Sequence, residues 1–363
     1  MRLGVEAALV GGQLVPGDVE ILDGRVRAYG LPSPGGRGIA VPGFVDLQVN
    51  GFAGVDFLGA DAAGYARAGE ALLATGVTAY LPTLVTAPEE TLVEAIRSVP
   101  LGRDGPRIVG VHLEGPFLAP GRLGAHPPAF RRDPDPALLE RLLAAGPVRL
   151  VTLAPELPGG LELVRLARRR GVAVSLGHSD ATAEQAHAAF DLGAVAVTHL
   201  FNAMRPFHHR EPGLAGAALS RPDVIVQLIV DGVHLANDTV RLVWRLAAGR
   251  VALVTDATAL AGQGGSSPTL GGAPIEAREG AARRPGGVLA GSMLTMAEAV
   301  RALHGLGAPL AEALEAASLV PARVLGAGEL GRLDVGLPGD IVVLDDRLEV
   351  RRVLVGGRTR VEA

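Results

Sequence analysis

Side chains that can bind a metal ion or a proton follow several apolar segments of this chain. Glu114, His178, His199 and Asp256 each stand at the end of such a segment. Imidazole and carboxylate groups together can bind a divalent metal and leave one position for water, as in many metal-dependent hydrolases. A lone buried histidine is more often a hydrogen-bonded core residue, but the repetition at segment ends favours one shared site. Other polar residues at such ends are Gln48, Asn50, Asp231 and His234.

The segments themselves have the length and β-branched composition of buried parallel strands. They alternate with segments of helical composition, which predicts an α/β fold, a (β/α)8 TIM-like barrel. An open, doubly wound sheet is the alternative, but no G-x-G-x-x-G sequence follows the first run. In a barrel the carboxyl ends of all strands meet at one mouth, so the polar residues would converge there. The predicted strands are residues 41–50, 78–85, 108–114, 149–154, 172–178, 195–199, 224–231 and 251–256.

Local signals place some of the helices and turns. Residues 62–75, 136–145 and 183–192 have helical composition. Thr86 and Glu89 have the spacing of a capping box, which predicts that a further helix opens at Thr86. The loop at 262–268 has a composition that fits a lid or a plain surface loop equally well.

Both ends of the chain are rich in short strands and turns. The Asp23-Gly24 pair separates two alternating segments, which is a hairpin signal, and residues 340–357 show a similar pattern. Chain termini usually lie close together. The sequence therefore predicts a small β-sandwich domain from residues 1–40 and 326–363, around a barrel of residues 41–325.

The composition excludes several kinds of chemistry. Cysteine is absent from the 363 residues, which excludes disulfides and thiolate metal sites, and all 34 basic residues are arginine, which excludes a lysine Schiff base. The net charge of −4 does not indicate a protein that binds nucleic acid, which usually needs an excess of basic residues. No apolar run approaches the roughly 20 residues of a membrane span. With no signal-peptide core at the start, we expect a cytoplasmic protein that acts on a small molecule, without nucleic acid or membrane as partner.

Several motifs together resemble the amidohydrolase superfamily, and within it the N-acetylglucosamine-6-phosphate deacetylase family. The order and spacing of these motifs from about residue 40 to 292 carry the resemblance, and the strands at the termini fit the β-sandwich of that family. The two most specific are HLEGPF at 112–117 and THLFNAM at 198–204. The others are PGFVD at 42–46, GHSDA at 177–181, REPG at 210–213, DGVH at 231–234, TDA at 255–257 and LAGS at 289–292.

The resemblance implies that Glu114, His178 and His199 bind one divalent metal per chain. Gln48 and Asn50 stand where many members place a His-x-His pair for a second metal, and amides are poor ligands compared with imidazole. A chain without lysine also lacks the carboxylated lysine that bridges two metals in many relatives. We therefore expect a single tight metal, with Zn²⁺ preferred and Fe²⁺, Mn²⁺ or Co²⁺ as alternatives. Gln48 and Asn50 would hold at most a weak second metal or a water.

The resemblance further implies hydrolysis of N-acetyl-D-glucosamine 6-phosphate to D-glucosamine 6-phosphate and acetate, in amino-sugar catabolism. Asp256 would be the general base and acid, because a carboxylate beside the attacking water can take its proton and pass it to the leaving amine. His112 is expected to support the ligands rather than to bind metal. In the family some phosphate contacts cross a dimer interface, so a homodimer is expected. The implied substrate-binding residues are His126, Asn202, Ala203, Arg210, His234, Ala290, Gly291 and Ser292.

Three other functions compete with this one. The nearest keeps the chemistry and changes the sugar, for example to N-acetylgalactosamine 6-phosphate. A second is another amidohydrolase, such as a dihydroorotase-like enzyme or a deaminase, against which the absent His-x-His and lysine argue. The third is a non-catalytic amidohydrolase-like scaffold protein, which would be expected to have lost the metal ligands or Asp256.

Overall fold

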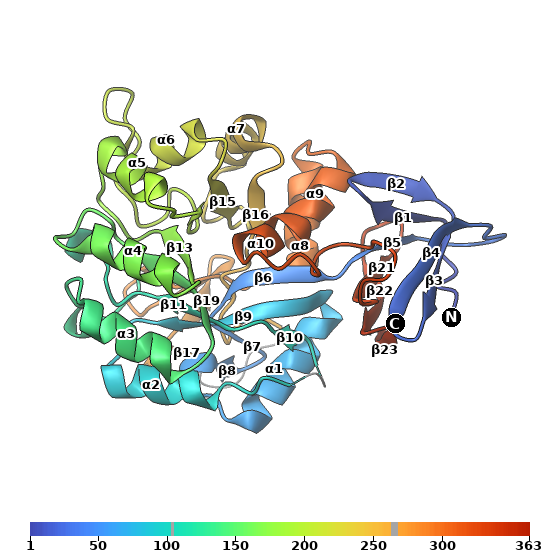
Figure 1. Cartoon of the computed structure of the whole chain (residues 1–363), viewed down its shortest axis with the longest axis horizontal. Helices are drawn as coiled ribbons and strands as arrows, with labels where there is room; N and C mark the ends of the chain where they lie inside the picture. Colours follow the sequence, from blue (N-terminus) through green and yellow to red (C-terminus); the bar gives the residue numbers. More distant parts are fainter. Residues whose placement is uncertain (103–104, 263–267) are drawn as a thin grey trace.

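The barrel predicted from the sequence is present, with helices around it and a smaller sheet domain at one end (Figure 1). The structure is a computed structural model that describes residues 1–102, 105–262 and 268–363. The sequence predicts a lid or a plain surface loop at 262–268. Most of this loop, residues 263–267, lies outside the described ranges. Within the described ranges, no helix has both the length and the apolar character needed to cross a membrane.

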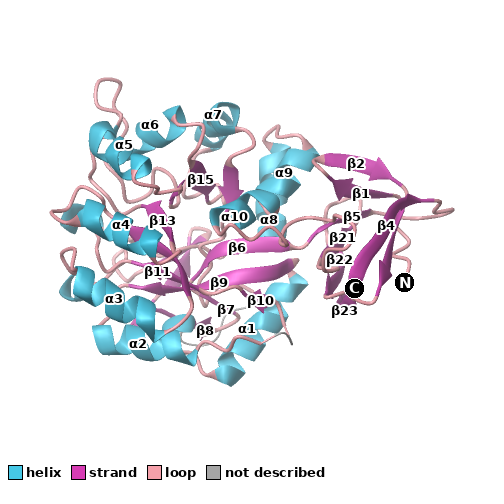
Figure 2. Ribbon diagram, viewed as in Figure 1, coloured by secondary structure: helices cyan, strands magenta, loops and turns pink. Residues whose placement is uncertain are grey.

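Parallel strands form the barrel inside the ring of helices (Figure 2). Their hydrogen-bonded neighbours follow the order of the chain. The first and last strands meet through a bridge between Val49 and Ala257 and a 2.9 Å hydrogen bond from Asp256 N to the Gln48 carbonyl. The predicted barrel is thereby confirmed. Its strands are β6 (Phe44–Val49), β9 (Val77–Val85), β11 (Val111–Glu114), β12 (Val148–Leu153), β13 (Ala173–Leu176), β14 (Ala196–Val197), β15 (Ile225–Leu228) and β16 (Val251–Leu253).

Helices cover the outside of the barrel, so the strands are buried on both faces. Every residue of β9 is buried, which is why this strand has no polar and apolar alternation. The covering helices are amphipathic: Leu163 and Val164 of α4 are buried, whereas Arg168 and Arg169 stand in its last turn. The helices are α1 (Ala62–Ala74), α2 (Glu89–Ser98), α3 (Pro136–Ala145), α4 (Gly160–Arg169), α5 (Ala183–Asp191), α6 (Gly213–Ser220), α7 (Asn237–Ala247), α8 (Met296–Gly305), α9 (Leu310–Ala316) and α10 (Leu319–Val324).

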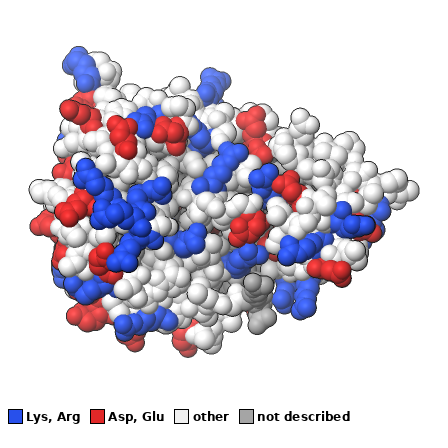
Figure 3. Space-filling model, in the orientation of Figure 1, with Lys and Arg blue, Asp and Glu red and all other residues white. Residues whose placement is uncertain are grey.

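Charged side chains of both signs lie over the outer helices. On the face shown in Figure 3, basic side chains gather over α4 with acidic ones among them. Ion pairs join neighbouring helices here: Arg170 pairs with Glu140 of α3, and Arg141 of α3 pairs with Glu89 of α2 at 2.6 Å. Exposed pairs of this kind contribute little stability each, so the barrel depends on its apolar core.

The two termini build the smaller domain together, beside each other in Figure 1. A six-stranded sheet has the order β2-β1-β5-β21-β22-β23, and the hairpin of β3 and β4 faces it across an apolar layer that includes Val19, Ile21 and Ile341. The strands are β1 (Ala7–Val10), β2 (Gln13–Pro16), β3 (Asp18–Leu22), β4 (Arg25–Leu31), β5 (Ile39–Pro42), β21 (Ile341–Leu344), β22 (Val350–Val355) and β23 (Arg358–Glu362). Shorter elements outside both sheets are β7 (Gly51–Phe52), β8 (Val55–Asp56), η1 (Phe57–Gly59), η2 (Pro120–Arg122), η3 (Pro128–Phe130), β17 (Thr269–Leu270), β18 (Ala273–Pro274), β19 (Glu276–Arg278) and β20 (Ala281–Arg283), while β10 (Arg107–Ile108) pairs with β9.

Two local predictions are wrong. The run at 41–50 is not one strand, because β5 ends at Pro42 in the terminal sheet and β6 starts at Phe44 in the barrel. The capping box at Thr86 is absent as well: α2 begins at Glu89, and its N-cap, Pro88, makes no side-chain hydrogen bond. The hydroxyl of Thr86 lies 2.9 Å from His126 Nδ1 instead, so a tertiary contact replaces the local cap. The predicted domain boundaries at 40/41 and 325/326 stay predictions.

Gly43 lies between β5 of the terminal sheet and β6 of the barrel, at a point where no side chain fits. A Cβ built on Gly43 would lie 1.9 Å from Thr78 Oγ1. We expect Gly43→Ala to lower the free energy of unfolding by about 1–3 kcal/mol, as overpacking typically does. Gly59→Ala is the matched control, because a Cβ there has no atom within 4 Å. Chemical denaturation of both variants tests this, and equal stabilities would contradict the steric explanation.

Candidate active site

The polar residues predicted at strand ends do converge. Glu114 is the last residue of β11, and His178, His199 and Asp256 follow β13, β14 and β16 by two or three residues. These last three have positive φ angles of 49°, 30° and 50°. Such backbone is uncommon outside glycine and often marks a functional site. At these strand ends it turns the chain just where the side chains meet.

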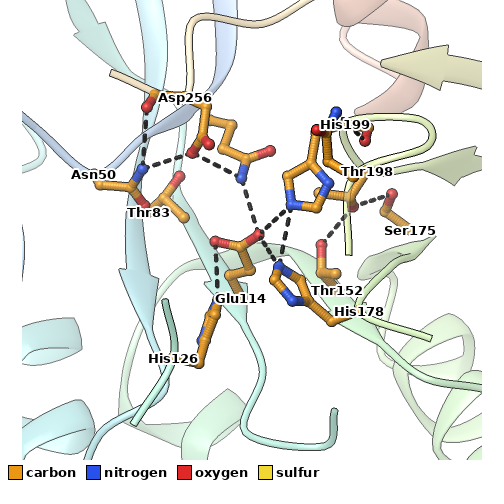
Figure 4. A network of polar contacts seen from close by, with 12 residues as sticks. Asn50, Thr83, Glu114, His126, Thr152, Ser175, His178, Thr198, His199 and Asp256 are labelled. Atoms are coloured by element: carbon orange, nitrogen blue, oxygen red, sulfur yellow. Dashed lines mark hydrogen bonds and ion pairs between the residues drawn. The ribbon is translucent and has the colours of Figure 1, made fainter. Parts of the chain in front are cut away.

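Glu114, His178 and His199 place one atom each around a common point (Figure 4). Glu114 Oε1 lies 3.1 Å from His178 Nε2 and 3.0 Å from His199 Nε2, and the two Nε2 atoms are 3.1 Å apart. All three residues are buried. Ligand atoms at such mutual distances suit the first shell of a single small cation.

The hydrogen bond at His178 Nδ1 leaves Nε2 in the form that a metal ligand needs. Its Nδ1 lies 2.8 Å from the carbonyl oxygen of Arg122, which can only accept, so Nδ1 carries the proton. In the neutral ring, Nε2 then presents a lone pair to the Glu114 carboxylate and to His199. Facing lone pairs repel unless a metal ion or a proton lies between them. A backbone carbonyl on the far nitrogen is also a usual partner of a metal-bound histidine.

Gln48 and Asn50 use their amides to hold Asp256. Gln48 Nε2 donates to Glu114 Oε1 and to Asp256 Oδ1, at 3.0 Å each, and Asn50 Nδ2 donates to Asp256 Oδ1 at 2.7 Å. Their amide oxygens are buried without a hydrogen-bond partner among the described residues. The weak second metal or water predicted at Gln48 and Asn50 stays a prediction.

Burial and neighbouring charge set the protonation of the site. Burial raises the pKa of Asp256 to about 6, with a further contribution from the charge of Glu114. Burial also lowers the pKa of His126 to about 4, which keeps its ring neutral near pH 7. The pKa of Glu114 moves well below its usual range, because contacts with His126, His178 and His199 outweigh the opposing effect of burial. Asp256 is thus a carboxyl group whose pKa suits proton transfer near neutral pH.

A cavity of about 270 Å³ opens over this cluster. The metal-ligand candidates and Asp256 line it on one side, and apolar side chains such as Leu270 and Val288 line it elsewhere. His234 belongs to the wall, and its Nδ1 is held by Asp231 Oδ2 at 2.7 Å. The residues predicted at the site that line the cavity are Asn50, Glu114, His126, His178, His199, Asn202, Ala203, His234, Asp256 and Gly291.

Three predicted substrate contacts lie elsewhere. Ala290 and Ser292 are buried and do not line the cavity; Ser292 N donates to the Asp256 carbonyl at 2.8 Å. Arg210 is exposed, outside the lining of the cavity, with Nη1 2.9 Å from His209 Nε2. His112 also stays out of the ligand cluster, with Nε2 2.8 Å from Thr152 Oγ1.

Two residues of the site were missed by sequence reasoning. Arg122 lines the cavity beside His178, and its guanidinium pairs with Asp180 at 2.7 Å. Thr86 contacts His126 from below the cavity. Arg122 has one available signal, its place in the loop that leads to His126. The sequence holds no such signal for Thr86, because its spacing from Glu89 indicates a helix cap instead.

Comparisons with known proteins agree with this geometry. A model of the Amidohydrolase family matches residues 39–360. N-acetylgalactosamine-6-phosphate deacetylase of Escherichia coli O157:H7 is 41% identical over 261 residues, covering 71% of this chain and 69% of that protein. N-acetylglucosamine-6-phosphate deacetylase of Homo sapiens is 40% identical over 280 residues, covering 73% and 68%. A solved N-acetyl-D-glucosamine-6-phosphate deacetylase mutant from Mycobacterium smegmatis, in complex with N-acetyl-D-glucosamine-6-phosphate, has a TM-score of 0.94 at 39% identity over 99% of each chain.

Proposed function

The chain belongs to the amidohydrolase family, and from that premise we propose that it hydrolyses N-acetyl-D-glucosamine 6-phosphate to D-glucosamine 6-phosphate and acetate. The observation that carries the proposal is that the cluster of Glu114, His178 and His199 lines the same cavity as Asp256. Relatives of that name, the human enzyme and the M. smegmatis structure among them, support the substrate. The reaction places the enzyme in amino-sugar catabolism.

Glu114, His178 and His199 would hold one divalent metal, which when bound polarises the acyl oxygen and acidifies water. We propose Zn²⁺, because two imidazoles and a carboxylate with one open position are typical of catalytic zinc. Fe²⁺, Mn²⁺ and Co²⁺ accept the same donors and are the alternatives.

Asp256 performs the proton transfers in the proposed reaction. Its carboxylate takes a proton from the water that attacks the acyl carbon, and it later gives that proton to the sugar nitrogen as the C–N bond breaks. Gln48 and Asn50 orient the carboxylate by donating to Oδ1. His126 lines the same cavity and is placed to donate to the acyl oxygen, where charge develops.

We propose that His234 and the backbone of Asn202 and Ala203 bind the phosphorylated sugar within one chain, and that Arg210 reaches the site of a second chain. Support for the second part is the exposure of Arg210 away from its own cavity, together with the match of guanidinium to phosphate. This arrangement requires the homodimer expected from the sequence. The homodimer and the cytoplasmic compartment stay predictions.

Mixing two variants with different defects, one in substrate binding and one in proton transfer, tests the shared site. Arg210→Ala is expected to raise KM for the phosphorylated sugar about tenfold or more, with little effect on the unphosphorylated sugar. Co-expression with Asp256→Asn would form hybrid dimers with one complete site each. At low substrate concentration we expect about a quarter of wild-type activity, because half of the dimers are hybrids and one of their two sites is intact. Activity no higher than that of the two separate variants would rule out a contribution from the second chain.

The galactosamine epimer is the second candidate substrate, favoured by the E. coli O157:H7 relative. Acetate release from both sugar phosphates, before and after chelation and with metal counted per chain, separates the possibilities. We expect faster release from the glucosamine epimer, loss of activity on chelation and recovery on adding metal. Faster release from the galactosamine epimer would reverse the assignment. Bound metal without release from either sugar would overturn the proposed function.

A further inference from the structure

Thr86 lies directly below His126, at the end of β9. Its backbone N is 3.2 Å from His126 Nδ1, and its hydroxyl Oγ1 is 2.9 Å from the same atom. Thr86 and His126 are both buried. The hydroxyl also lies 3.4 Å from the carbonyl oxygen of Glu114, a metal-ligand candidate. The hydroxyl has a single proton, so it can donate to only one of these two acceptors, and His126 Nδ1 is the nearer.

The backbone contact decides which nitrogen of His126 carries the proton. A backbone N–H can only donate, so Nδ1 must accept and cannot itself be protonated. The neutral ring then carries its proton on Nε2. Because Nδ1 is closed to a proton, the doubly protonated ring is excluded in this geometry too. The Thr86 hydroxyl must also donate if it bonds to Nδ1, since an Nδ1–H is already excluded.

The proton on Nε2 remains available to a ligand in the cavity. The contact of Nε2 with Glu114 Oε2, at 3.6 Å, is longer than an ordinary hydrogen bond. His126 belongs to the cavity wall. A neutral N–H donor aimed at a developing oxyanion stabilises it without giving up the proton.

We propose that Thr86 is a positioning residue that locks His126 as the Nε2–H tautomer, so that His126 donates a hydrogen bond to the acyl oxygen and transfers no proton. The hydrogen bond from His126 to the acyl oxygen rests on the proposed function, whereas the assignment of the tautomer does not. A ring that keeps its proton leaves both proton transfers to Asp256, the group assigned to them in the proposed function.

Direct observation of the ring is the first test. In the zinc-loaded, ¹⁵N-histidine-labelled protein near pH 7, the His126 signals should show an unprotonated Nδ1 and a protonated Nε2. His126→Gln identifies them by their loss. A protonated Nδ1, alone or together with Nε2, would overturn the proposal. This readout needs no substrate, so it holds or fails separately from the proposed function.

Substitution of Thr86 is the second test. Thr86→Val removes the hydroxyl at nearly constant volume, and we expect kcat to fall about tenfold with KM little changed, since one of two donors that orient the ring is lost. Thr86→Ser should restore most of the rate. An N-trifluoroacetyl substrate has a more electrophilic carbonyl and needs less help from the ring, so Thr86→Val should slow it only about twofold. Equal losses on both substrates, or no rescue by serine, would assign Thr86 a merely structural role.

Discussion

Replacing Asp256 with asparagine is expected to lower kcat by about 10³-fold while the metal content stays near that of the wild type. An amide cannot take a proton from water, and general acid–base catalysis typically supplies 10²–10⁴-fold in rate. The substitution preserves shape, and the oxygen that accepts from Asn50 and Gln48 remains. Steady-state acetate release and metal analysis on the same sample measure both quantities.

The control for this variant is Asp191→Asn, which removes a carboxylate from an exposed ion pair with Arg221. Its kcat should equal that of the wild type. Activity of Asp256→Asn within about tenfold of wild type would remove Asp256 from proton transfer.

The pH dependence of kcat/KM tests the role of Asp256 independently of the substitution. Burial and the charge of Glu114 raise the pKa of Asp256 to about 6 without metal, and a bound cation lowers it. The protonated carboxyl cannot act as a base, so kcat/KM should fall as pH decreases through a value below about 6. A profile that instead falls with rising pH in this range would contradict the assignment.

The fold could be predicted where local residues decide the structure. The segment 136–145 matches α3 to the residue, because Asp135 caps the helix and Pro136 occupies its first turn. The run at 41–50 could not be divided correctly, since Gly43, where the two strands part, packs closely against Thr78, a neighbour in space and not in sequence. Local signals therefore gave the elements, and tertiary contacts decided which sheet each strand joined.

In the candidate site, too, the sequence predicts some residues and misses those that act through tertiary contacts. Glu114 and His178 could be identified as candidates because the role proposed for them depends on their side chains, which stand at or just after strand ends. Arg122 acts on His178 through a backbone carbonyl, and Thr86 acts on His126 partly through a backbone N–H. Every residue has these groups, so residue type carries no signal for them. Arg210 has the right chemistry for a phosphate, but an exposed position that sequence could not foresee.

Replacing His178 with alanine should abolish metal binding and, with it, hydrolysis. Only Glu114 and His199 would remain of the ligand cluster, and changes merely to the partners of ligands already cost 10–100-fold in affinity. We expect less than about one tenth of the wild-type metal per chain after dialysis. Zinc at about 100 times its wild-type Kd should stabilise the wild type by about 2.7 kcal/mol and the variant hardly at all. His187→Ala, on α5, is the matched control and should keep both metal and activity. A His178→Ala protein that still holds one metal per chain and gains the same thermal stability from zinc would place the metal elsewhere.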